Sequence, residues 1–218
     1  AGIQADIKTV TALGSYAMTA VTAVTAQNTI EVKKITSVPI KNIQKQITMI
    51  LDDIGVHAVK IGMLHNTNVI RCVCSILKKY KLKNIVLDPV MIAKSGSKLI
   101  NNNSIVYLKK KLLPLCSLVT PNIPEAEVLT GSSISNKEDM IKAAKKIISM
   151  GAKNVLLKGG HLKNKMIFDI LVSKKKIKIF SKRKIRTKNT HGTGCTLSSA
   201  LATCLSQKKN VIKSCKIS

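Results

Sequence analysis

Residues 84–89 read NIVLDP, a short apolar run that ends in a carboxylate and a proline. Residues 116–120 (CSLVT) and 153–158 (KNVLLK) repeat this pattern of a brief apolar run followed by polar residues. Runs of this length without strict alternation are typical of strands that are buried on both faces of a sheet. These three stretches therefore predict strands of a parallel sheet.

Helix-like and strand-like patterns alternate along most of the chain. Apolar spacing and end signals predict helices over residues 3–14, 39–54, 66–80, 103–113, 136–150 and from 193 to about 205. Further strands are expected over residues 16–26 and 57–63, with an edge hairpin over 166–173 and 176–181. This order predicts an α/β protein with a doubly wound, mainly parallel sheet in a three-layer α/β/α arrangement. Residues 1–218 are expected to form a single domain.

The composition excludes several classes of protein. The chain carries 37 Lys+Arg and 10 Asp+Glu, a net charge of +27, but only three arginines, 2% aromatics and no Trp. Base recognition favours arginine and stacking aromatics, so nucleic acid is not the expected partner. The six cysteines form no CxxC pair, and no apolar stretch is long enough to span a membrane. With no signal peptide recognisable, we expect a cytoplasmic protein with free thiols.

Polar or chemically distinctive residues follow five of the expected strands. These residues are Gln27, Met63, Asp88, Asn122 and Lys158. The carboxyl ends of parallel strands share one edge of an α/β sheet, and ligands bind there. The sequence therefore predicts one crevice into which these side chains converge.

The sharpest local signal is THGTGCT at residues 190–196, which opens the last expected helix. Two glycines allow a ligand to approach the backbone, and a helix start offers free N–H groups and a positive dipole end, as in phosphate sites. The stretch matches neither a P-loop nor a dinucleotide fingerprint. Cys195 would lie in the first helical turn, where the dipole favours a thiolate. The other five cysteines are interpreted as small core residues.

Oxygen ligands are expected at another helix start, which follows the strand over residues 116–120. Asn122 and Glu125 are spaced N-x-x-E after a strand, and Asp88 follows a neighbouring strand. Such groups suit Mg²⁺, and Lys158 could neutralise a transferring phosphoryl group. Together with a polar acceptor pocket near Asp6 and Gln27, these residues predict a phosphoryl-transfer site.

Several longer motifs resemble one family. AGIQADIKTVTALGSYAMTAVTAVTAQNT, KIGML, LDPVMIAKSG, VTPNIPEAEVLTG, LLKGGHL and THGTGCTLSSALA together resemble the bacterial hydroxymethylpyrimidine/phosphomethylpyrimidine kinases of thiamine biosynthesis, which belong to the ribokinase-like superfamily. The similarity runs from Ala1 to about Leu205. It implies an ATP-dependent phosphotransferase that phosphorylates 4-amino-5-hydroxymethyl-2-methylpyrimidine and then its monophosphate.

The resemblance also implies roles for individual residues. Cys195 would be the general base or would position the hydroxyl, while the backbone of Gly192, Thr193 and Gly194 holds the developing charge and Lys158 faces phosphate. The implied acceptor site is Gln27, Met63, Asp6, Gly2 and Ala1. Lys158, His191 and Thr190 would bind nucleotide, and Asp88, Asn122 and Glu125 would bind Mg²⁺. A homodimer is a further implication.

Two features depart from the family pattern. The first strand with its Ser-Asp-x-Ser-Gly-Gly stretch and the C-terminal helices of the family have no counterpart in residues 1–218. We therefore expect a domain that lacks both. Three alternatives stay open: a pyridoxal-type kinase of the same fold, a degenerate non-catalytic kinase fold, and a basic nucleic-acid-binding protein that only the charge favours.

Overall fold

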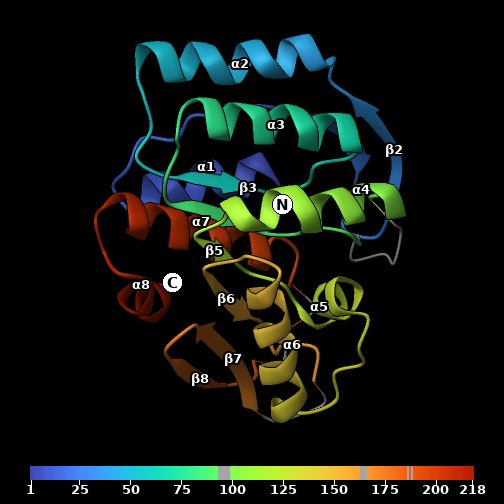
Figure 1. Ribbon diagram of the computed structural model, residues 1–218, viewed down its shortest axis with the longest axis vertical. Helices are drawn as coiled ribbons and strands as arrows, with labels where there is room; N and C mark the ends of the chain where they lie inside the picture. Colours follow the sequence, from blue (N-terminus) through green and yellow to red (C-terminus); the bar gives the residue numbers. More distant parts are fainter. Residues whose placement is uncertain (93–98, 163–165, 186, 188) are drawn as a thin grey trace.

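The computed structural model describes residues 1–92, 99–162, 166–185, 187 and 189–218. Its centre is a six-stranded sheet whose spatial order follows the chain: β3 (Val59–Ile61), β4 (Ile85–Leu87), β5 (Leu118–Val119), β6 (Asn154–Leu157), β7 (Met166–Ser173) and β8 (Ile177–Arg183) (Figure 1). Strands β3 to β6 are parallel, whereas β7 and β8 pair antiparallel at one edge. The predicted mainly parallel sheet with an edge hairpin is confirmed.

Helices cover both faces of the sheet. On one face α7 (Thr193–Ser206) packs on β3 and β4 and is flanked by α1 (Ile3–Ala12) and α8 (Val211–Ile217). The helices associated with the other face are α2 (Ile40–Asp53), α3 (Thr67–Lys79), α4 (Asn102–Tyr107), α5 (Ile123–Thr130) and α6 (Lys137–Ser149). The expected three-layer α/β/α arrangement is therefore present. None of the described helices has the length and apolar character needed to cross a membrane.

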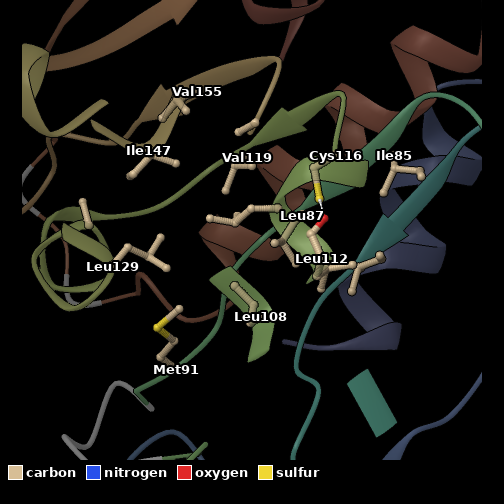
Figure 2. Packing of buried hydrophobic residues seen from close by; sticks show 14 of the residues in the cluster. Ile85, Leu87, Met91, Leu108, Leu112, Cys116, Val119, Leu129, Ile147 and Val155 are labelled. Atoms are coloured by element: carbon tan, nitrogen blue, oxygen red, sulfur yellow. Dashed lines mark hydrogen bonds between the residues drawn. The ribbon is translucent and has the colours of Figure 1, made fainter. Parts of the chain in front are cut away.

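The core has two parts because successive strand residues point to opposite faces. Val86, Leu118 and Leu156 pack with Leu201 and Leu205 of α7. Their strand neighbours, Leu87 and Val119 among them, pack into the larger cluster on the other face, which Figure 2 shows from close by. Burial on both faces explains why these strands read as continuous apolar runs.

The prediction of a buried strand over residues 16–26 is wrong. The strand is β1 (Ala23–Gln27), which pairs antiparallel with β2 (Val32–Ser37) in a separate two-stranded sheet. Val24 is 61% exposed, and the stretch is rich in Thr and Ala, so it offers little large apolar surface to bury. Gln27 therefore does not end a strand of the central sheet.

The expected helix over residues 103–113 also changes character along its length. After α4 the chain forms a turn of π-helix (Leu108–Leu112) and then a 3₁₀ turn (Leu113–Leu115). Pro114 lies in that last turn, and proline cannot donate the hydrogen bond that would continue an α-helix. The sequence reasoning did not predict β2 or α8. Residues 93–96 of the LDPVMIAKSG motif lie outside the described residues.

Candidate active site at the carboxyl edge of the sheet

A buried ion pair joins the ends of β4 and β6. Nζ of Lys158 lies 2.9 Å from Oδ1 of Asp88, and the side chains are 15% and 3% exposed. Thr120, at the end of β5 between them, donates its hydroxyl to the same carboxylate oxygen at 3.3 Å. Three neighbouring strand ends thus supply one polar cluster, as the sequence predicted for Asp88 and Lys158.

The start of α7 lies directly against this ion pair. A Cβ added at Gly194 would lie 3.2 Å from Nζ of Lys158 and 3.7 Å from Oδ2 of Asp88. Gly192 precedes the helix with φ 83°, a left-handed conformation that glycine adopts without steric cost. The two glycines of the motif are therefore required for different reasons. Gly192 allows the backbone turn, and Gly194 leaves room for the ion pair.

The N-terminus of this 14-residue helix is suited to an anion. Within the described residues no side chain caps α7 at Gly192, and the Thr193 hydroxyl instead donates to the carbonyl of Thr190 at 3.0 Å. The first-turn N–H groups and the helix dipole then face the region beside Lys158, an arrangement that favours phosphate oxygens. Cys195 is half-buried in this first turn. All six cysteines lie in the described part of the chain and are free.

Asn122 and Glu125 form a reciprocal cap at the start of α5. Oδ1 of Asn122 accepts the Glu125 N–H at 2.9 Å, and Oε2 of Glu125 accepts the Asn122 N–H at 2.8 Å. Burial raises the pKa of Glu125 to about 7, although Lys158 opposes the shift, and the nearby Asp88 carboxylate adds to it. The N-x-x-E spacing is thus a capping box.

The described residues contain no cluster of three or more His, Cys, Asp or Glu side chains that could hold a metal. The carboxylates of Asp88 and Glu125 interact with the Lys158 ammonium, and Asn122 forms an isolated β-bridge with Lys158. Mg²⁺ commonly keeps several waters and uses one or two carboxylates plus substrate phosphates. The residues present fit that mode of binding and not an all-protein cage.

The expected acceptor residues lie on two segments that are linked by a hydrogen bond. Met63 follows β3 and is half-buried, and its carbonyl accepts the hydroxyl of Thr22 at 3.0 Å. Gln27 ends β1, is exposed, and lines a hollow formed by residues 27–32 together with His191. The small sheet therefore brings Gln27 close to the motif at the start of α7 without being part of the central sheet.

Asp6 is engaged differently from the expectation that it faces the acceptor. Its carboxylate pairs with Nζ of Lys60 at 2.9 Å and accepts the Ser199 hydroxyl at 2.7 Å. Gly2 precedes α1, and Ala1 lies against Gly192, 3.4 Å from the Cβ position of that glycine. The N-terminal backbone is thus beside the anion site, while the Asp6 carboxylate contacts other protein groups.

Sequence reasoning missed Lys60, Ser199 and Asp169. Oδ1 of Asp169 accepts the N–H of Gly159 at 2.9 Å, immediately after Lys158, and burial raises the pKa of this carboxyl. The available signal was a single charge within an apolar strand, as in HAVKIGM and MIFDILVS. Charged residues are rarely buried without a partner, so such a residue indicates a specific contact.

Comparison with known proteins identifies the family of this chain. The sequence profile of a family described as phosphomethylpyrimidine kinase matches residues 1–218. The hydroxymethylpyrimidine/phosphomethylpyrimidine kinase of Bacillus subtilis is 43% identical over 202 residues, which cover 92% of this chain and 74% of that protein. The thiamine biosynthesis bifunctional protein ThiED of Geobacter sulfurreducens is 49% identical over 207 residues, 95% of this chain but only 42% of that protein.

Solved structures show the same fold. A phosphomethylpyrimidine kinase from Clostridium difficile superimposes with a TM-score of 0.88 at 43% identity, covering 100% of this chain and 89% of that one. An ADP complex of pyridoxal kinase from Bacillus subtilis gives a TM-score of 0.91 at 34% identity, covering 99% and 82%. Because the family profile matches all of residues 1–218, the chain belongs to the phosphomethylpyrimidine kinase family.

Proposed function

We propose that this chain is an ATP-dependent kinase that phosphorylates 4-amino-5-hydroxymethyl-2-methylpyrimidine and then its monophosphate. One observation carries the proposal: the Gly194 backbone at the start of α7 lies against the Lys158–Asp88 pair, where an added Cβ would contact both side chains. This arrangement offers backbone donors, a helix dipole and an ammonium group to one phosphoryl group. The relatives' names supply the acceptor.

In the proposed reaction the acceptor hydroxyl oxygen bonds to the γ-phosphorus of ATP, and the bond to the β,γ-bridging oxygen breaks. The N–H groups of Gly192, Thr193, Gly194 and Cys195 would hold the phosphoryl oxygens. Lys158 would balance their charge. Cys195 would accept the hydroxyl proton or would position the hydroxyl, and Thr190 and His191 would face the nucleotide.

On the acceptor side, Gln27 would hydrogen-bond the aminopyrimidine, since a primary amide offers donors and an acceptor in one plane. Met63 would pack on the ring, and the backbone of Ala1 and Gly2 would close the pocket. Mg²⁺ would be held by the phosphates, with Asp88, Glu125 and Asn122 contacting it directly or through water, and it would neutralise charge on the transferred group. The free thiols and the use of ATP favour a cytoplasmic location. A homodimer remains a prediction.

The test is a coupled ADP-release assay on the purified chain with hydroxymethylpyrimidine, its monophosphate and pyridoxal as separate acceptors. Turnover with both pyrimidines is expected. Preference for pyridoxal would assign the chain to the second activity known in this fold, and no ADP release with any acceptor would overturn the proposal.

A variant pair tests the role of Cys195. Cys195→Ala should lower kcat by about 10²-fold, because general-base assistance contributes at least that much. Cys72→Ala, which removes a half-buried thiol on α3, is the matched control and should turn over normally. Normal turnover of Cys195→Ala would show that this thiol only lines the pocket and takes no part in proton transfer.

A further inference from the structure

A polar contact outside the phosphate site joins three elements that are distant in the sequence. Asp6 on α1 accepts hydrogen bonds from Lys60 on β3 at 2.9 and 3.0 Å and from Ser199 on α7 at 2.7 Å. The Lys60 and Asp6 side chains are 11% and 20% exposed, and Ser199 is fully buried. We call these three residues the Asp6 bridge.

Each of the three elements carries part of the candidate site at one end. Helix α1 begins beside Gly2, and β3 leads into Gly62 and Met63. A Cβ at Gly62 would lie 3.1 Å from Nζ of Lys60, so this ammonium group lies next to the backbone that leads to Met63. Helix α7 begins at Thr193, less than two turns before Ser199.

Apolar packing does not fix α1 in the way that it fixes the central helices. No residue of α1 is buried, whereas α3 buries six residues. The position of α1 relative to α7 therefore depends strongly on polar contacts. Within a regular helix, a displacement at Ser199 also displaces Gly194 and Cys195, because the intervening residues form a rigid rod.

We propose that the Asp6 bridge positions the start of α7 against the acceptor end of β3, and that Asp6 and Lys60 are positioning residues. Its catalytic consequence rests on the proposed kinase function. A small misplacement between a phosphoryl group and an acceptor hydroxyl is costly, because transfer needs the reacting atoms in close and aligned contact. Asp6 then acts through α7 and not on the substrate.

The experiment compares Lys60→Met, Asp6→Asn and Ser199→Ala with the unmodified chain. Thr203→Val is the matched control, because the Thr203 hydroxyl donates to the Ser199 carbonyl within α7. Four quantities are measured: kcat, the KM for ATP, amide hydrogen exchange over residues 191–196, and the alkylation rate of Cys195 followed by mass spectrometry. The last two do not require turnover.

For Lys60→Met and Asp6→Asn we expect a loss of kcat of about tenfold or more, a nearly unchanged KM for ATP, faster exchange at residues 191–196 and a changed alkylation rate of Cys195. Thr203→Val should change none of these four. A lower melting temperature with wild-type kcat and wild-type exchange at 191–196 would make the bridge purely structural and overturn the proposal.

Two provisions keep the test decisive. If the charge variants fail to fold, Ser199→Ala decides, because it removes one neutral hydroxyl and leaves the ion pair intact. If the unmodified chain phosphorylates no acceptor, the proposed function fails. The exchange and alkylation data then still show whether the bridge controls the start of α7.

Discussion

The first 37 residues and the strands β4 to β6 are held in place by different forces. Strands β4 and β5 are buried at every position, and β6 at all but its first. No residue of α1, β1 or β2 is fully buried. The N-terminal region instead makes polar contacts with the rest of the chain: the Asp6 bridge, Thr22 to the Met63 carbonyl, and Gln46 and Gln207 to backbone groups of residues 13–21.

The two regions also carry different halves of the candidate site. Asp88, Thr120 and Lys158 follow β4, β5 and β6 directly, so these side chains of the phosphate half are placed by the buried strands of the core. Gln27 and Gly2 belong to the N-terminal region, so this part of the acceptor half is held against the core by polar contacts. The Asp6 bridge links the two regions, because it joins α1 to β3 and α7.

The largest expected effect is on the core side of this comparison. Leu87 is fully buried, and Leu87→Ala should lower the free energy of unfolding by about 2–5 kcal/mol, because it removes buried carbon atoms and leaves a cavity. Val24→Ala on β1, where the side chain is 61% exposed, should change it by less than about 0.5 kcal/mol. Urea unfolding measures both, and similar losses would erase the proposed difference between the regions.

Glu125 gives a pH-dependent effect within the core-anchored half. Its pKa is about 7 in the folded protein against 4.5 without burial, so the folded chain retains a proton that the unfolded chain releases between these values. Stability should therefore fall as the pH rises through this window, by up to about 3 kcal/mol above pH 7.

Glu125→Gln tests this directly. The neutral variant should be more stable than the unmodified chain at pH 8 and similar to it near pH 4.5, as measured by urea unfolding at both values. Glu138→Gln, at an exposed position in the first turn of α6, is the control for the loss of one carboxylate. A pH-independent difference for Glu125→Gln would mean that this carboxyl is not held protonated by burial.

A smaller effect is expected in the acceptor half. Gln27→Leu should raise the KM for the pyrimidine by about tenfold with little change in the KM for ATP, since each unpaired polar group costs about 1–3 kcal/mol. Gln44→Leu, which replaces an exposed amide on α2, is the control. Equal changes in both KM values for Gln27→Leu would argue against separate halves.

The smallest effect concerns the polar attachment of the N-terminal region. Nε2 of Gln207 donates to the Leu13 carbonyl at 2.7 Å and to the Ser15 hydroxyl at 3.2 Å. Gln207→Ala should cost about 0.5–1.5 kcal/mol. The loss should appear as faster amide exchange over residues 3–12, with exchange in β4 to β6 unchanged. Uniformly faster exchange would indicate that the two regions unfold together.

The sequence predicted the fold best where one physical effect dominates. The apolar runs predicted β4 to β6. The helical spacing with its end signals predicted the bounds of α1, α2, α3 and α6 to within a few residues. It failed for residues 16–26, because valine and threonine favour a strand whether or not the strand is buried. Only the tertiary structure decides whether such a strand joins the central sheet.

The candidate site was predictable to the extent that topology alone gathers it. Strand ends meet at one edge of the sheet, so the order of the strands is enough to bring Asp88 and Lys158 together. The Asp6 bridge was not predictable, because its partners lie 54 and 193 residues from Asp6 and neither pairing leaves a local pattern. For the same reason the sequence places Asp6 with the acceptor, whereas its carboxylate pairs with Lys60 and Ser199.

Gly159 sets a limit on how this sequence can change over generations. A Cβ at this position would lie 2.1 Å from the carbonyl oxygen of Phe168, on the neighbouring strand β7. Every other amino acid carries a Cβ, so any missense mutation at Gly159 would push the chain after Lys158 away from β7. Most surface residues of this chain can be replaced, but a replacement of Gly159 should be removed by selection for as long as the enzyme is needed.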